Sequence, residues 1–135
     1  MSKVLITGTS SGIGFETAIV LGRAGHTIYA TMRNLERGAA LREVVEREQL
    51  PISIVKMDVD SDESVDAATS AIRAQTGCID VLVNNAGIER TGSIEGLALD
   101  DFKATMETNY FGPIRTIRAW LPDMRQRRSG CAMTL

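Results

Sequence analysis

A glycine-rich segment near the N-terminus, TGTSSGIG at residues 7–14, contains the first residues whose types and spacing indicate chemistry. It lies between the apolar run KVLIT and a segment of helical periodicity. Glycines let the backbone turn sharply and approach a phosphate, and the N–H groups at a helix start attract negative charge. The segment therefore predicts a site for a pyrophosphate, and a glycine-rich turn without a ligand is the alternative. The predicted contact residues are Gly8, Ser10, Ser11, Gly12, Ile13 and Gly14.

A second position that bears on ligand binding follows the next predicted strand, where the sequence reads YATMRN at residues 29–34. Proteins that bind NAD place an Asp or Glu at this point to hold the ribose hydroxyls. Here there is no carboxylate, and the guanidinium of Arg33 suits the 2′-phosphate of NADP, with the Ser11 hydroxyl in reach. We therefore expect NADP(H) as the cofactor in preference to NAD; a solvated surface arginine is the alternative.

Three further polar sites lie near the ends of predicted elements. Asp58 and Val59 end the third predicted strand, NNAG at residues 84–87 ends the fourth, and Asn109 lies in a long helical region. Ligands of open parallel sheets bind in the crevice at the carboxyl ends of the strands. Each of these positions alone also fits a cap, a turn or a satisfied polar group. The expected crevice residues are Asp58, Val59, Asn85, Ala86 and Gly87.

The elements that must hold these residues are short apolar runs that alternate with helical segments. The runs are KVLIT, HTIYATM, ISIVKMDV, DVLVNN and CAMTL, and such runs are typical of strands buried on both faces of a parallel sheet. The pattern predicts an α/β fold, a doubly wound parallel sheet of about five strands with alternating helices. The helices carry apolar stripes formed by Phe15, Ala18, Ile19 and Gly22, by Leu41, Val44 and Val45, and by Val65, Ala68 and Ile72.

The last helical region, residues 100–128, contains Gly112-Pro113, which predicts a kink or a division. Phe111 and Trp120 are expected to point away from the main apolar face of its second part. So broad an apolar surface requires burial on two sides. The residues expected on the main face are Tyr110, Ile114, Ile117, Leu121 and Met124.

The same residues resemble the motifs of the short-chain dehydrogenase/reductase family, whose glycine motif is Thr-Gly-x-x-x-Gly-x-Gly. The family's acidic residue at the adenine ring corresponds to Asp58, its Asn-Asn-Ala-Gly to residues 84–87 and its structural and catalytic asparagine to Asn109. The resemblance implies a Rossmann-type NAD(P)-binding domain over residues 1–135 of an oxidoreductase that interconverts alcohols with ketones or aldehydes. TSSGIG and YATMRN are most similar to the hydroxysteroid and retinol dehydrogenase branch.

The family's chemistry also uses a serine and a Tyr-x-x-x-Lys pair, and this pair does not occur in the chain. Tyr29 is followed four residues later by Arg33, and Tyr110 by Ile114. The resemblance therefore implies an N-terminal half, truncated at the start of the fifth strand and inactive alone, in which Asn109 is the single member of the catalytic set. A non-catalytic nucleotide-binding module and a chain completed by a partner are the alternatives.

Composition and charge argue against several other classes of function. The net charge of -2, without a basic stripe, does not favour nucleic acid binding. No apolar stretch reaches the roughly 18 residues of a membrane span, and a single histidine gives no basis for a metal site. The widely spaced Cys78 and Cys131 fit buried thiols in a reducing cytoplasm. The expected partner is a small-molecule carbonyl or alcohol, and the complete enzyme is expected to be a homo-oligomer.

Overall fold

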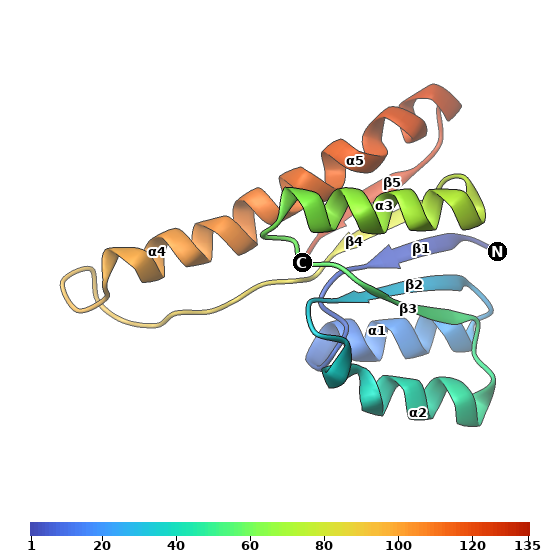
Figure 1. Cartoon of the computed structure of the whole chain (residues 1–135), viewed down its shortest axis with the longest axis horizontal. Coiled ribbons are helices and arrows are strands. Elements are labelled where there is room, and N and C mark those ends of the chain that lie inside the picture. The colour runs from blue at the N-terminus through green and yellow to red at the C-terminus, as the bar shows by residue number, and fades with distance from the viewer.

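The computed structural model describes all 135 residues and contains one parallel sheet with helices on both faces (Figure 1). Its strands lie in the order β3-β2-β1-β4-β5, and every neighbouring pair is parallel. The predicted α/β fold with a five-stranded parallel sheet is confirmed. The strands are β1 (Lys3–Ile6), β2 (Thr27–Met32), β3 (Ile52–Lys56), β4 (Val81–Asn84) and β5 (Cys131–Thr134).

Helices connect the successive strands as crossovers. Figure 1 shows α1 and α2 on one face of the sheet and α3 and α5 on the other. The direction of winding reverses at β1, where the chain passes from the β2 side to the β4 side of the sheet. The helices are α1 (Gly12–Arg23), a short 3-10 helix (Leu35–Gly38), α2 (Ala39–Glu48), α3 (Asp62–Thr76), α4 (Leu99–Met106) and α5 (Gly112–Arg127).

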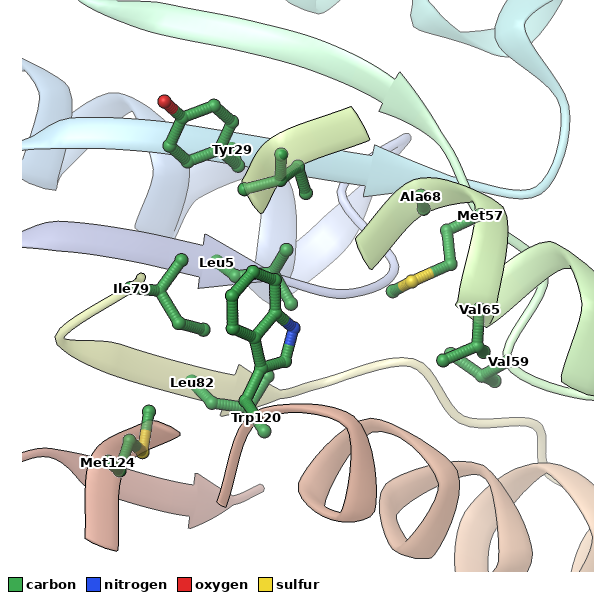
Figure 2. Close-up of a cluster of buried hydrophobic side chains, with 11 residues drawn as sticks. Leu5, Tyr29, Met57, Val59, Val65, Ala68, Ile79, Leu82, Trp120 and Met124 are labelled. Atoms are coloured by element: carbon green, nitrogen blue, oxygen red, sulfur yellow. The ribbon is translucent and has the colours of Figure 1, made fainter. Parts of the chain in front are cut away.

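Successive side chains of a strand point to opposite faces of the sheet, so the buried side chains form two clusters, one on each face. Val4 and Ile6 of β1 pack with buried residues of α1 and α2, such as Leu41, whereas Leu5 belongs to the cluster on the other face. The predicted stripes of α1, α2 and α3 face these two clusters. The cluster that includes α3 and α5 is drawn in Figure 2 and contains Leu5, Tyr29, Met57, Val59, Val65, Ala68, Ile72, Ile79, Leu82, Trp120 and Met124.

The third and fourth strands end earlier than the sequence predicts. β3 ends at Lys56, so Asp58 and Val59 follow the strand instead of ending it. The backbone leaves the ladder there because the Asp58 N–H donates to the Ser64 hydroxyl at 2.8 Å. In the same way, the N–H of Asn85 donates to the Thr7 hydroxyl at 3.0 Å, one residue after β4 ends.

β5 is an outer strand of the sheet, and all four of its residues are exposed. The expectation that CAMTL is a buried strand is therefore wrong for this chain. So is the expectation that Cys131 is a buried thiol, because it lies on this exposed strand. Cys78 is partly buried, and both cysteines are free.

The long C-terminal helical region continues through the predicted break. A π turn, Glu107–Phe111, joins α4 to α5, and Figure 1 shows the two helices in line, extending beyond the sheet. Pro113 follows directly after the π turn and lacks the N–H that would continue the regular hydrogen-bond ladder, so the irregular turn lies where the proline interrupts that ladder. The predicted apolar face is wrong in part: Tyr110 and Leu121 are exposed, whereas Trp120 is buried. The buried line of α5 is Gly112, Thr116, Trp120 and Met124.

Candidate functional site

The glycine-rich loop between β1 and α1 lies against the segment that follows β4. Gly8 has a φ of +68°, and a Cβ on it would lie 2.8 Å from the Cα of Ala86. Gly12, with a φ of +63°, begins α1. Glycine adopts positive φ without a steric penalty. Both the turn of this loop and its close approach to Ala86 therefore depend on glycine.

The start of α1 is open to an anion. Ser11 is the N-cap residue, but its side chain makes no capping hydrogen bond. The first turn of the helix also contains no acidic side chain. The first N–H groups of α1 therefore have no side-chain acceptor, and they carry the positive end of the helix dipole. A phosphate group is a suitable ligand for such a helix start.

Thr7 and Asn85 join the glycine-rich loop to the end of β4. The buried Thr7 hydroxyl accepts hydrogen bonds from the N–H groups of Asn85, at 3.0 Å, and Ala86, at 2.9 Å. The Asn85 side-chain amide donates to the carbonyls of Thr7, at 3.0 Å, and Gly8, at 2.9 Å. Asn85, which the sequence predicts as a cofactor contact, thus also positions the loop, and Thr7 has the same role.

These segments form part of an open cleft of about 340 Å³ at the carboxyl ends of the strands. Ten of the predicted cofactor-binding residues line it: Gly8, Ser10, Ser11, Ile13, Arg33, Asp58, Val59, Asn85, Ala86 and Gly87. Gly12 and Gly14 do not line the cleft. Gly12 begins α1 beside it, and Gly14 is buried where a Cβ would collide with the Gly8 carbonyl oxygen and the Asn85 amide.

The cleft is also lined by four residues that the sequence does not predict: Met32, Met57, Asp60 and Thr108. Met32, Met57 and Asp60 lie within two residues of Arg33 or Asp58, so a wider window around those two residues would include them. Thr108 gave no such signal, because its place depends on the π turn. Its hydroxyl donates to Oδ1 of Asp60 at 2.8 Å, so two walls of the cleft are joined directly.

Asn109 lies beside the cleft and is not part of its lining. Its amide oxygen accepts the N–H of Ile88 at 2.8 Å, and its amide nitrogen donates to the carbonyl of Ile88, also at 2.8 Å. Gly87, which precedes Ile88 in the chain, does line the cleft. Asn109 therefore holds the segment after β4 against the π turn, which is an indirect contribution to the shape of the cleft.

A second hollow, of about 450 Å³, lies between α3 and α5 and includes none of the predicted site residues. The cleft at the strand ends is therefore the candidate site. The chain has no cluster of three or more His, Cys, Asp or Glu side chains placed to bind a metal ion. None of its helices combines the length and the apolar character that crossing a bilayer requires.

Comparison with known proteins agrees with the fold. The chain matches a family model described as short chain dehydrogenase over residues 2–134. Retinol dehydrogenase 8 of Bos taurus is 43% identical over 132 residues, which are 94% of this chain and 41% of the relative. Human 17-beta-hydroxysteroid dehydrogenase type 1 is 38% identical over 133 residues, 94% of this chain and 40% of the relative. The chain thus spans less than half the length of these relatives.

Solved structures resemble the chain over nearly its whole length. A gluconate 5-dehydrogenase from Burkholderia cenocepacia, in complex with NADP and tartrate, has a TM-score of 0.89 and 34% identity over 98% of this chain and 52% of its own. An alcohol dehydrogenase from Thermococcus sibiricus, complexed with 5-hydroxy-NADP, has a TM-score of 0.90 and 29% identity over 99% of this chain and 57% of its own. Since the family model also covers almost every residue, the chain belongs to the short-chain dehydrogenase/reductase family.

Proposed function

We propose that this chain is the cofactor-binding part of an NADP-dependent oxidoreductase that interconverts an alcohol with a ketone or aldehyde. The observation that carries the proposal is the meeting of the glycine-rich loop, Arg33 and Asp58 in one cleft at the strand ends. Membership of the family supports an oxidoreductase. Two of the similar solved structures contain NADP or a derivative of it, which supports the phosphorylated cofactor.

The cleft has features that suit a dinucleotide phosphate. The uncapped N–H groups of α1 are donors for the pyrophosphate, and Gly8 lets the loop turn and pack against Ala86, which also lines the cleft. Arg33 is exposed at the end of β2, and residues 29–34 contain no carboxylate that would repel a 2′-phosphate. Ser11 lines the same cleft and supplies a hydroxyl. This chemistry favours NADP(H) over NAD(H).

The adenine side of the cleft is assigned to the segment after β3. Asp58 Oδ1 accepts the N–H of Asp60 at 3.0 Å, and the Asp58 N–H is bonded to Ser64, so this acid is held by its own loop. Val59 adds a buried apolar surface. A nicotinamide cofactor supplies hydride transfer when bound, and the residues of this chain bind and orient it. Asn109 contributes by holding the segment after β4.

The substrate class in this proposal is a small-molecule alcohol or carbonyl compound. The names of similar relatives refer to retinol and to 17-beta-hydroxysteroids. Proton transfer to the substrate oxygen is assigned to residues outside these 135, since the chain contains no Tyr-x-x-x-Lys pair. The 135-residue chain by itself is therefore expected to bind cofactor without turning over substrate.

Self-association and a cytoplasmic location belong to the same proposal. The rod formed by α4, the π turn and α5 exposes large apolar side chains, which favours burial against another copy. These side chains are Leu99, Met106, Tyr110, Phe111 and Leu121. The two free cysteines favour a reducing compartment.

Calorimetric titration of the wild type and Arg33→Asp tests the cofactor assignment. The wild type is expected to bind NADPH at least about 10-fold more tightly than NADH, and Arg33→Asp is expected to remove that preference, because a carboxylate repels the 2′-phosphate. Arg37→Asp, at an exposed position outside the cleft, is the matched control and should leave the preference unchanged. Equal affinity of the wild type for both cofactors would contradict the proposal.

A further inference from the structure

The π turn between α4 and α5 sends neighbouring side chains to different walls of the cleft. Thr108 donates to Oδ1 of Asp60 in the loop after β3. Asn109, the next residue, exchanges two hydrogen bonds with the backbone of Ile88 in the segment after β4. A π turn inserts an extra residue into the helical repeat, and such turns are frequent at functional sites. The position of this single turn therefore affects both walls.

Arg115, in the first turns of α5, joins the segment after β3 to the start of the π turn with one guanidinium. Its Nη1 donates to the backbone carbonyl of Val59 at 3.0 Å, and its Nε donates to Oδ1 of Asp62 at 2.6 Å. Its Nη2 donates to the Glu107 carboxylate at the start of the π turn. A planar guanidinium fixes its partners in direction as well as distance, which a lysine does not.

The surroundings of Arg115 keep these bonds in place. The side chain is 21% exposed. Burial acts against its charge, but hydrogen bonds to Asp62 and Glu107 outweigh burial, so the pKa of Arg115 is raised above its ordinary value. Gly112 lets α5 approach the loop, since a Cβ there would lie 2.9 Å from Cγ2 of Val59. Helix and loop thus meet closely at the point where the guanidinium bonds both.

We propose that Arg115 is a positioning residue for the cofactor: it sets the distance between the adenine wall at Val59 and the π turn that carries Thr108 and Asn109. This inference rests on the proposed function, namely that the cleft binds NADP(H). Val59 and Thr108 line the cleft, whereas Arg115 does not. Arg115 therefore acts on the ligand through these neighbours. A preorganised wall raises affinity because no ordering of the loop is required on binding.

The experiment measures affinity for NADPH and for 2′,5′-ADP, the adenosine half of the cofactor, in the wild type, Arg115→Gln, Arg115→Lys and Arg118→Gln. Arg118 is exposed one turn further along α5 and forms no hydrogen bond or ion pair, so Arg118→Gln is the matched control. Arg115→Gln is expected to weaken binding of both ligands about 10-fold, since charge-assisted hydrogen bonds are lost and the wall is no longer held. Arg115→Lys keeps the charge without the fork and is expected to recover part of the loss.

Hydrogen exchange, measured without ligand, separates positioning from general stability. Arg115→Gln is expected to speed exchange at the amides of Asp60 and Ser61 and in the π turn, with β1 and β4 unchanged. A general loss of stability would speed exchange throughout the sheet and would overturn the inference. Unchanged ligand affinity in Arg115→Gln, with a wild type that binds NADPH, would overturn the inference alone. A wild type that binds neither ligand would overturn the proposed function and the inference with it.

Discussion

Gly12 and Gly14 are two residues apart at the start of α1, but glycine is required at each for a different reason. Gly12 has a φ of +63° and open space where a Cβ would lie. Gly14 has an ordinary helical backbone, and its Cβ position is filled by the Gly8 carbonyl and the Asn85 amide. The requirement at Gly12 is thus conformational, and the requirement at Gly14 is for space.

Alanine substitution separates these two requirements. Gly14→Ala is expected to lower the free energy of unfolding by about 3 kcal/mol, because the collision displaces Asn85 and the loop that it holds. Gly12→Ala is expected to cost about 1 kcal/mol, the strain of a positive φ in a residue with a side chain. Urea unfolding measures both losses, and NADPH titration of the folded variants should show the larger effect for Gly14→Ala. Equal losses would contradict this account of Gly14.

Helix α5 illustrates why the sequence predicts the existence of an element better than its buried face. Hydropathy favours Ile114 and Leu121, but the buried line includes the small Gly112 and the polar Thr116. Gly112 allows the helix to approach Val59 in the loop after β3, and the Thr116 hydroxyl donates to Oδ1 of the buried Asn84 at 2.5 Å. Partners of this kind come from distant parts of the chain, so the local pattern contains no sign of them.

Trp120 and Met124 are the buried side chains of α5 in the core cluster that Figure 2 shows. Trp120 is the larger of the two. It is 1% exposed, and the guanidinium of Arg73 from α3 lies 5.0 Å from its ring. Trp120→Ala is expected to reduce the free energy of unfolding by about 3–5 kcal/mol. Its neighbour Leu121 is 44% exposed, and Leu121→Ala is expected to cost less than about 1 kcal/mol. Urea unfolding compares the two variants. A larger loss of unfolding free energy in Leu121→Ala would contradict this account and support the buried face predicted from hydropathy.

Asp80 connects the start of β1 to the end of α5. Its carboxylate accepts the Lys3 N–H at 2.8 Å and a hydrogen bond from Arg127 at 3.2 Å. The Lys3 bond, with a further contribution from Arg127, lowers the pKa of Asp80 below its ordinary value of 3.8, against the effect of burial. A lowered pKa in the folded state means that this stabilisation is present above about pH 3.8 and is lost as the pH falls through the folded value.

Urea unfolding of the wild type and Asp80→Asn at several pH values tests this linkage. The wild type is expected to be the more stable at pH 7, and the difference is expected to shrink as the pH falls below about 4, because the protonated acid resembles the amide. Asp66→Asn, at an exposed position of α3 without an ion pair, is the control and should show little difference at any pH. A difference between the wild type and Asp80→Asn that does not change with pH would contradict the assigned role.

For the molecule as a whole, the sequence predicts the sheet, the helical connections and ten of the residues that line the cleft. These features follow from local patterns: apolar runs, glycine spacing and polar residues after strands. The π turn, the Thr108 bond to Asp60 and the bonds of Arg115 could not be predicted in this way. They depend on how α5 lies against the loop after β3, and that packing brings together residues about fifty positions apart.

The two outer strands of the sheet, β3 and β5, differ in how well they are protected from pairing with a strand of another molecule. This difference predicts whether the chain self-associates in solution. β3 follows Pro51 and ends in Lys56, features that hinder pairing with another sheet, whereas β5 contains no charge and no proline. The 135-residue chain is therefore expected to self-associate through β5, in addition to any association through the exposed apolar side chains of α4 and α5, with a sedimentation coefficient that rises with protein concentration. Met133→Lys, at a 46% exposed position, should shift the chain toward monomer, because a charge on an edge strand opposes pairing. Ser53→Lys on β3 is the matched control and should have little effect, and a wild type that stays monomeric at every concentration would contradict the prediction.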